Sequence, residues 1–328
     1  MKAVARPTKK EDIIGELTSD IFVRKTNKGG NEIYCFTAKQ SPILMQEVGR
    51  LRELTFRSAG GGTGKDVDID KFDTADIPYE QLIVWDPKDQ NIIGGYRFFN
   101  ASKVNKDQID YLATSRLFEF SDKFKDIYLN KTIELGRSFV QPMYQSRDMG
   151  RKSLYALDNL WDGLGALTVD NPDIEYFFGK VTMYTSFNIE ARDLILYFMK
   201  LYFNDPDNLL KPYNPINLNI DENAIKHHFR GNDYKADYKI LSRLVRDKGE
   251  NIPPLVNAYM NLSPSMRTFG TALNSFFGNV EETAIMIKLD EIYETKKARH
   301  IATYLPHIKI KKLPIINKIE KVIHKNKK

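Results

Sequence analysis

Apolar positions along this 328-residue chain follow two periods, one typical of helices and one typical of strands. In residues 42–57, Leu44, Val48 and Leu51 recur at helical spacing, which predicts an amphipathic helix. Further helices are predicted at 188–203, at 234–248 and after Pro253-Pro254. Strands are predicted at 81–86, 92–99, 133–140, 175–182 and 284–289. Interleaved helices and strands without a repeat predict one mixed α/β domain on a central sheet.

The stretch from residue 131 to 165 combines a charged strand with the start of a helix. Glu134 and Arg137 lie inside the predicted strand 133–140, where a charge is costly unless it is paired or used. A loop with Arg147-x-x-Gly150 precedes a helix predicted from about residue 148 to 167. Free N–H groups at a helix N-terminus favour a phosphate, so a carboxylate and a phosphate cradle fall on consecutive elements. A surface ion pair and a chance Arg-x-x-Gly are the alternative interpretations.

Charge is distributed unevenly along the chain. The formal net charge is +6, but residues 296–328 contain ten Lys, one Arg and one Glu, so they carry +10 and the rest about −4. We therefore divide the chain into a globular domain, 1–295, and a basic tail, 296–328. In the tail, five apolar residues recur at helical spacing between lysines: Ile315, Ile316, Ile319, Val322 and Ile323.

Composition makes several classes of protein improbable. No run approaches the roughly 20 apolar residues that span a bilayer, and the N-terminus has no apolar signal core. Cys35 is the one cysteine, which excludes an internal disulfide and fits a reducing cytoplasm. The histidines do not combine with it at zinc-ligand spacing, so we expect no metal.

The segment SAGGGTGK, residues 58–65, is followed by five aspartates. A helix precedes the glycines and acids follow them, which argues against a phosphate loop and favours a mobile loop over a site. The spacing of Asp68, Asp70 and Asp73 does not fit an EF-hand. These acids are predicted to hold an ammonium group or to pair with Arg52 and Arg97; a solvated acidic loop is the alternative.

Together these segments resemble the bacterial amino-acid N-acyltransferases that make lyso-ornithine lipid and glycine lipid, a hemolysin-like branch of the GNAT fold. The motifs that carry the resemblance are Leu51-Arg52-x-x-x-Phe56, Asp68-x-Asp70-x-Phe72-Asp73, Ile93-Gly94-Gly95-Tyr96-Arg97, Glu134-Leu135-Gly136-Arg137-Ser138, Leu160-Trp161-x-Gly163-Leu164 and Ile252-Pro253-Pro254-Leu255-Val256. Their order and spacing match over roughly residues 40–290. The charged succession is also similar to acyl-homoserine-lactone synthases.

The resemblance implies a GNAT-like α+β fold, a central mixed twisted sheet flanked by helices. It implies that Glu134 accepts the proton of the acceptor amine. Phosphopantetheine-binding residues would be Arg147, Gly150, Arg151 and Lys152. Substrate-binding residues would be Arg52, Phe56, Asp70, Asp73, Arg97 and Arg137, with Arg97 or Arg137 clamping the acceptor carboxylate.

Two positions depart from the family pattern. Lys152 stands where the pyrophosphate loop usually ends in a small residue, which favours a carrier-protein donor over coenzyme A. Asn274-x-x-Phe277 replaces Asp-x-x-Phe and is followed by Glu281-Glu282, which weakens any transfer of acceptor-site roles. Glycine is the favoured acceptor, with ornithine next.

The predicted activity is therefore transfer of a (3-hydroxy)fatty acyl group from acyl carrier protein to an amino acid, without a separate cofactor. An acyl-homoserine-lactone-type synthase and a non-catalytic lipid- or carrier-binding protein are the alternatives. Arg137, Arg147, Arg151 and Lys152 are expected to contact the acidic carrier. The tail is expected to bind an anionic membrane surface, or else to pack on the domain. One aromatic residue in the tail argues against nucleic acid.

Overall fold

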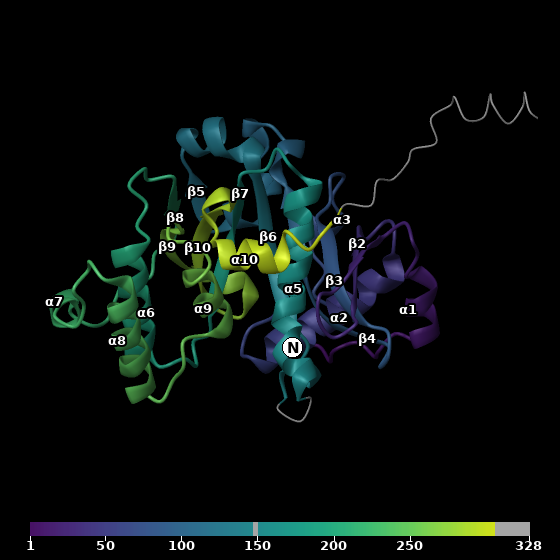
Figure 1. Cartoon of the computed structure of the whole chain (residues 1–328), viewed down its shortest axis with the longest axis horizontal. Helices are drawn as coiled ribbons and strands as arrows, with labels where there is room; N and C mark the ends of the chain where they lie inside the picture. Colours follow the sequence, from purple (N-terminus) through teal and green to yellow (C-terminus); the bar gives the residue numbers. More distant parts are fainter. Residues whose placement is uncertain (147–149, 306–328) are drawn as a thin grey trace, which may run out of the picture.

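An eight-stranded sheet runs through the protein, as the computed structural model shows (Figure 1). The structure describes residues 1–146 and 150–305. The strand order is β1-β2-β3-β4-β6-β7-β10-β9, and every neighbouring pair is antiparallel except β6 and β7. The strands are β1 Phe22–Lys25, β2 Glu32–Phe36, β3 Glu80–Asp86, β4 Asn91–Asn100, β6 Thr132–Val140, β7 Tyr176–Met183, β9 Arg267–Asn274 and β10 Val280–Lys288. A two-stranded ribbon pairs β5 Phe118–Phe120 with β8 Leu210–Pro212.

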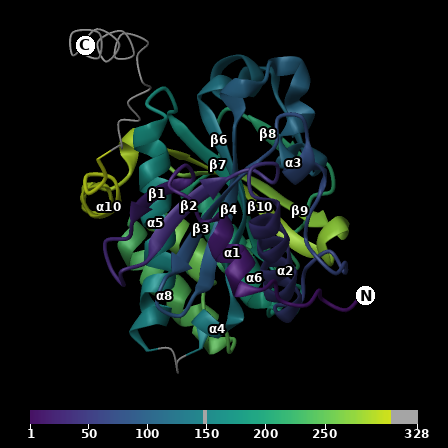
Figure 2. The same cartoon turned by 90° about the vertical axis from the view of Figure 1, so that its right-hand side faces the viewer.

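Helices surround this sheet on both faces (Figures 1 and 2). The α-helices are α1 Lys10–Glu16, α2 Pro42–Ser58, α3 Lys71–Thr74, α4 Pro142–Gln145, α5 Arg151–Asp170, α6 Ile189–Tyr202, α7 Glu222–Lys226, α8 Tyr234–Asp247, α9 Pro254–Met260 and α10 Glu294–His300. Between β4 and β6 the chain makes short 3₁₀ turns, the ribbon strand β5 and one π-helical turn: η1 Ala101–Lys103, η2 Lys106–Tyr111, η3 Ala113–Arg116, η4 Phe124–Tyr128 and η5 Leu129–Lys131. Two more 3₁₀ turns flank β10, namely η7 Ser275–Phe277 and η8 Leu289–Glu291.

Alternation along the strands assigns side chains to two cores. Ile33, Leu82 and Val84 pack with Leu160 and Leu164 of α5 in one core. On the opposite face, the neighbouring strand residues Tyr34, Ile83 and Trp85 pack with apolar residues of α2. The 101–131 segment adds a third core on the same face as the α2 core. This third core includes Phe99, Phe178 and Met286 from the sheet. Because neighbouring strand residues point to opposite faces, the sheet has an α5 face and an α2 face.

The parallel pair β6 and β7 separates halfway along. Their pairing runs from Thr132 opposite Tyr176 to Leu135 opposite Gly179 and ends there, although both strands continue. On its other side, β6 carries a bulge, since Gly95 faces Phe139 but Arg97 faces Gly136. A bulge bends its strand and increases its twist, and here it falls where β6 leaves β7.

The predicted elements agree closely with those observed, and the expected α+β architecture, a central mixed sheet flanked by helices, is confirmed. The prediction missed the short helices α3, α4 and α7 as well as α1, β9 and α10. It placed the domain boundary after residue 295, which falls inside α10. His300 is buried against Asp162 of α5, and Tyr304 is also buried, so packing continues past this boundary. The apolar stripe of the tail, 315–323, lies outside the described residues.

A substitution at Gly179 tests the close approach of β6 and β7 at their last paired residues, Leu135 and Gly179. A Cβ at this position would lie 2.4 Å from the carbonyl oxygen of Leu135, so backbone would have to move. We expect Gly179→Ala to lower the free energy of unfolding by about 1–3 kcal/mol, measured by urea denaturation. Gly15→Ala is the matched control, because a Cβ there meets nothing within 4 Å and alanine favours helix α1. Equal stability of the two variants would contradict the tight fit.

Candidate active site

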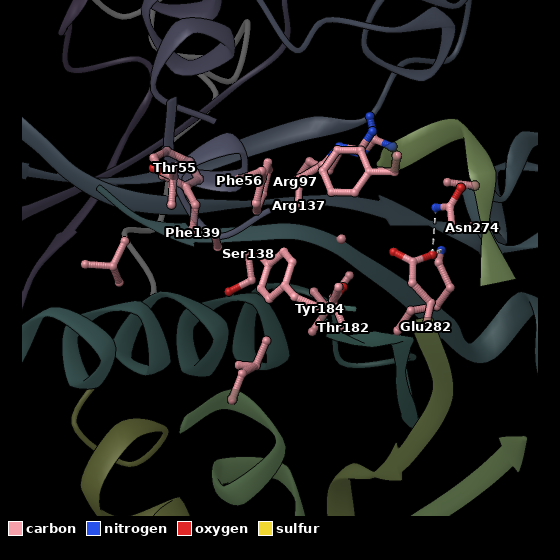
Figure 3. A pocket seen from close by; sticks show the side chains of 18 of the residues that line it. Thr55, Phe56, Arg97, Arg137, Ser138, Phe139, Thr182, Tyr184, Asn274 and Glu282 are labelled. Atoms are coloured by element: carbon pink, nitrogen blue, oxygen red, sulfur yellow. Dashed lines mark hydrogen bonds and ion pairs between the residues drawn. The ribbon is translucent and has the colours of Figure 1, made fainter. Parts of the chain in front are cut away.

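A cavity of about 560 Å³ occupies the gap between the separated strands (Figure 3). It is lined from the α5 face by Leu135 together with Ala156 and Leu157 of α5. From the α2 face it is lined by Glu134 and Phe139. The cavity therefore reaches both faces of the sheet through the split.

Apolar side chains form much of the wall, which suits an acyl chain. These residues include Phe56, Ala59, Leu117, Leu135, Phe139, Val140, Ala156, Leu157, Leu255, Phe276 and Phe277. Phe56, one of the predicted substrate contacts, packs edge-on against Phe277 with ring centroids 5.1 Å apart. The Arg137 guanidinium lies over the same Phe277 ring at 4.0 Å.

Arg52 lies at the centre of a buried ionic cluster beside the cavity. Its Nε donates to Asp68 at 3.0 Å and its Nη2 donates to Asp73 at 3.2 Å, and none of these side chains reaches solvent. Burial alone would raise the pKa of Asp73, but Arg52 and Arg97 lower it well below the usual range. Burial would likewise raise the pKa of Asp68, but the neighbouring arginines, Arg137 foremost, lower it below its usual value. Both aspartates are therefore ionised and paired.

Arg97 and Arg137 complete this cluster. Arg97 donates to Asp70 at 2.8 Å and to Asp73 at 3.3 Å, while Arg137 Nε donates to Asp68 at 2.8 Å. Three arginines thus face three aspartates with no net charge. The structure shows the predicted pairing of these acids with Arg52 and Arg97. A carboxylate clamp by Arg97 or Arg137 would have to compete with these ion pairs.

Arg137 also has an unusual backbone. Its φ is +49°, in the left-handed region that non-glycine residues rarely occupy. It lies in the bulge of β6, between Gly136 and Ser138, and all three line the cavity. Strained backbone of this kind occurs at functional sites when surrounding contacts fix it. Here the contacts are the Asp68 ion pair and the Phe277 ring.

Glu134 lines the cavity, and four donors surround its carboxylate. Oε2 accepts from the Tyr79 hydroxyl and from the Ala113 amide at 2.9 Å; Oε1 accepts from the Thr114 amide at 2.8 Å and from the Thr114 hydroxyl. Burial and Glu134 raise the pKa of Tyr79, so this hydroxyl stays protonated and donates. A carboxylate has about four acceptor positions, and all are occupied here. To act as the predicted base, Glu134 would have to release one donor.

The glycine-rich segment binds an anion of its own chain. The amides of Thr63 and Gly64 donate to the buried Glu53 carboxylate at 2.9 and 2.8 Å. Successive amides of this kind form an anion-binding nest. The segment therefore covers Glu53, in agreement with the rejection of a phosphate loop.

The predicted phosphate cradle is described in part. Gly150 precedes the 20-residue helix α5 with φ +53°, and Arg151 is exposed on the first turn. Lys152 pairs with Asp86 at 2.7 Å and also contacts Asp89. Arg147 lies outside the described residues. In the described part of the chain, no group of three or more His, Cys, Asp or Glu side chains is arranged to hold a metal ion.

Sequence reasoning missed several polar residues of the cavity. Lys180 of β7 and Glu282 of β10 project into it from the α2 face, and Asn274 of β9 donates to Glu282 at 3.1 Å (Figure 3). Arg116 stacks on Phe276 at 4.4 Å, and no carboxylate among the described residues pairs with it. Lys180 lies inside the predicted strand 175–182 and had the same signal as Glu134, a charge within an apolar strand. Glu282 lies outside the predicted strand 284–289, so neither Glu282 nor Arg116 had that signal.

The chain also matches known proteins. An acetyltransferase (GNAT) domain matches residues 51–153, which include the Arg52 cluster and Glu134. Fold, cavity and this match define an acyltransferase of the GNAT class. "Glycine N(alpha)-acyltransferase" of Bacteroides thetaiotaomicron is 53% identical over 307 residues, 93% of this chain and 91% of that protein. The protein of the same name from Phocaeicola vulgatus is 51% identical over 93% of this chain and 94% of its own.

The chain therefore belongs to the family of these N-acyltransferases, and it is an enzyme of that kind. The predicted family and enzyme class are confirmed. Among solved structures, the crystal structure of the AHL synthase LasI matches 84% of this chain and 98% of that chain with 11% identity and a TM-score of 0.40. That likeness is too slight to place any residue.

Removal of Arg52 should leave two buried carboxylates, Asp68 and Asp73, with one arginine partner fewer each. We expect Arg52→Met to lower the free energy of unfolding by about 3–5 kcal/mol, measured by urea denaturation at pH 7. Lys106→Met is the control: Lys106 forms an exposed pair with Asp126, and its loss should change stability by less than about 1 kcal/mol. A loss of similar size in both variants would contradict the importance of the buried cluster.

The pH dependence of stability gives a second test, made on the wild-type protein and Arg52→Met. Because the folded pKa values of Asp68 and Asp73 lie below the unfolded value of about 3.9, their stabilisation is complete above that pH. It is lost as pH falls from about 4 toward the folded values. The stability difference between wild type and Arg52→Met should therefore shrink as pH falls below about 4; a constant difference would contradict the assignment.

Proposed function

We propose that this enzyme transfers a fatty acyl group from a phosphopantetheine thioester to the α-amino group of glycine. The observation that carries the proposal is the cavity through the β6–β7 split, which is apolar along much of its wall and has Glu134, Lys180 and Glu282 on the α2 face. The relatives' printed name, glycine N(alpha)-acyltransferase, gives the acceptor. A thioester can enter from the α5 face while an amino acid occupies the α2 face.

Charges on the α2 face favour glycine over ornithine. Ornithine carries a second ammonium group, which would need its own carboxylate in the cavity. Asp70 is paired with arginines and Glu134 is fully hydrogen-bonded, so among the described carboxylates of the cavity Glu282 remains for one ammonium group and none remains for a second. Lys180 and Arg116 would repel a second cation. Glycine requires only one anionic and one cationic group.

The chemistry of the transfer requires a neutral amine at the thioester carbonyl. The amine attacks the carbonyl carbon, negative charge develops on the oxygen, and the thiol leaves. Backbone amides near the β6 bulge, at Gly136–Ser138, lie beside the cavity and are our candidates for stabilising that charge. In this proposal the Arg52 cluster holds the bulge in shape, because Asp68 pairs with both Arg52 and Arg137.

The donor is proposed to be an acyl carrier protein. Gly150 and the free amides at the start of α5 suit the phosphate of phosphopantetheine, and exposed Arg151 suits an acidic partner. Lys152 supports this less, because Asp86 and Asp89 already neutralise it. A (3-hydroxy)acyl chain remains the expected cargo, and no separate cofactor is required.

We further propose that the enzyme works at the inner face of the cytoplasmic membrane, where a lipid product would be released. None of the described helices is long and apolar enough to cross a membrane. The basic tail would supply the contact with anionic lipids. Co-sedimentation with anionic vesicles, with and without residues 308–328, tests this; equal binding of both proteins would refute it.

Acceptor choice is tested by competition. We expect the purified enzyme, given 3-hydroxyacyl carrier protein and equal glycine and ornithine, to form mainly N-acylglycine, measured by mass spectrometry. A preference of about tenfold corresponds to roughly 1.4 kcal/mol, less than an unpaired buried ammonium costs. Faster acylation of ornithine would show the acceptor assignment to be wrong. S-adenosylmethionine is included as a third acceptor, to test for lactone synthesis.

Carrier docking is tested at Arg151. Arg151→Glu should raise the apparent KM for acyl carrier protein several-fold at low salt, with a smaller effect at high salt, because screening weakens the docking charges. The kcat at saturating carrier should change little. Lys239→Glu on α8 is the matched control for charge reversal at an exposed site. If both variants keep the wild-type KM, the carrier does not dock at the start of α5.

A further inference from the structure

Glu282 differs from Glu134 in how its carboxylate is satisfied. Its side chain is 6% exposed, and Oε2 accepts one hydrogen bond, from Asn274 at 3.1 Å. Oε1 accepts no hydrogen bond from any described residue. The side chain lines the cavity, and Figure 3 shows it beside Asn274. A nearly buried carboxylate with a free oxygen facing a cavity is able to take a proton from a ligand.

Strand geometry places this carboxylate on the acceptor side. Along β10, Ala284 and Met286 pack in the core of the α2 face, so Glu282 projects to that face as well. By the same alternation, Lys180 of β7 and Glu134 of β6 project there too, next to Phe178 and opposite Phe99. The register pairs Glu282 with Thr182, so Lys180 is its diagonal neighbour.

Two hydrogen bonds and one ion pair connect the two glutamates. The Thr114 hydroxyl donates a hydrogen bond to Glu134 and accepts one from Lys180 at 3.0 Å. The Lys180 ammonium in turn lies 3.9 Å from Glu282 Oε2. Glu134 therefore orients Thr114, and Thr114 orients Lys180. In this arrangement Glu134 is occupied in holding neighbouring groups, while Glu282 keeps a free oxygen.

We propose that Glu282 is the general base that takes the proton from the acceptor ammonium group, an assignment that rests on the proposed N-acyl transfer. One N–H proton passes to Glu282, and the freed lone pair forms the C–N bond with the thioester carbonyl carbon. The C–S bond then breaks. The departing thiolate takes the second N–H proton and leaves as the thiol, and Glu282 returns its own proton to water.

The test uses two acceptors that differ in nitrogen protonation. Glycine is an ammonium ion near neutral pH, whereas aminooxyacetate keeps the carboxylate but has an unprotonated nitrogen. We expect Glu282→Gln to lower kcat for glycine about 100-fold or more, as loss of a general base does. With aminooxyacetate the same variant should stay within a few-fold of wild type. Glu282→Asp, which keeps the charge but shortens the reach, should give intermediate turnover with glycine only.

Controls separate this assignment from the proposed function. Glu281→Gln is the matched variant, because Glu281 is the adjacent residue on β10 and pairs with Arg192 outside the cavity; it should keep near-wild-type turnover. Equal losses with both acceptors in Glu282→Gln would show a structural role and overturn the proposal. Unchanged glycine turnover would overturn it as well. Failure of the wild-type enzyme to acylate glycine would instead refute the proposed function.

Discussion

The buried cluster of Arg52, Asp68, Asp73, Arg97 and Arg137 is the constraint on which the site depends. Buried charges are tolerated only when each has a partner, and here each arginine contacts two of the three aspartates Asp68, Asp70 and Asp73. The partners come from α2, α3 and its preceding loop, β4 and β6. Because no member can move without leaving an unpaired charge, these elements are fixed relative to one another. Arg137 can therefore keep a strained φ beside the cavity.

That constraint explains how a continuous sheet contains a gap between two neighbouring strands, β6 and β7. The bulge at Arg137 turns β6 away from β7 after Leu135, and Gly179 permits the close approach just before the split. Beyond it the two strands no longer exchange hydrogen bonds, and side chains from both faces line the gap. A donor and an acceptor can thus approach from opposite faces and meet between the strands.

Much of this fold was predictable because its long elements have clear periodicity. The helix at 42–57 and the strands at 81–86, 92–99 and 133–140 were placed within a few residues. β9 was missed because Gly270 interrupts its apolar pattern, and α10 because Glu294–His300 is almost entirely polar. The Arg–Asp pairs were predictable as pairs, since charges at buried positions need partners. Roles at the site were less predictable, because hydrogen-bond saturation depends on residues distant in sequence. Glu134 shows this: its donors Tyr79 and Thr114 lie 55 and 20 positions away.

Two carboxylates on one sheet face illustrate how surroundings divide roles between identical groups. Both Glu134 and Glu282 interrupt apolar strands, and both line the cavity. Four donors fix the Glu134 carboxylate. It holds Ala113 and Thr114 in place and, through the Thr114 hydroxyl, positions Lys180. Glu282 has one donor, Asn274, in place of the acid expected at that position. An aspartate there would repel Glu282 if both were ionised, whereas the amide donates to it and leaves one oxygen open. The substitution that weakened the family pattern is therefore what allows a second carboxylate to face the acceptor.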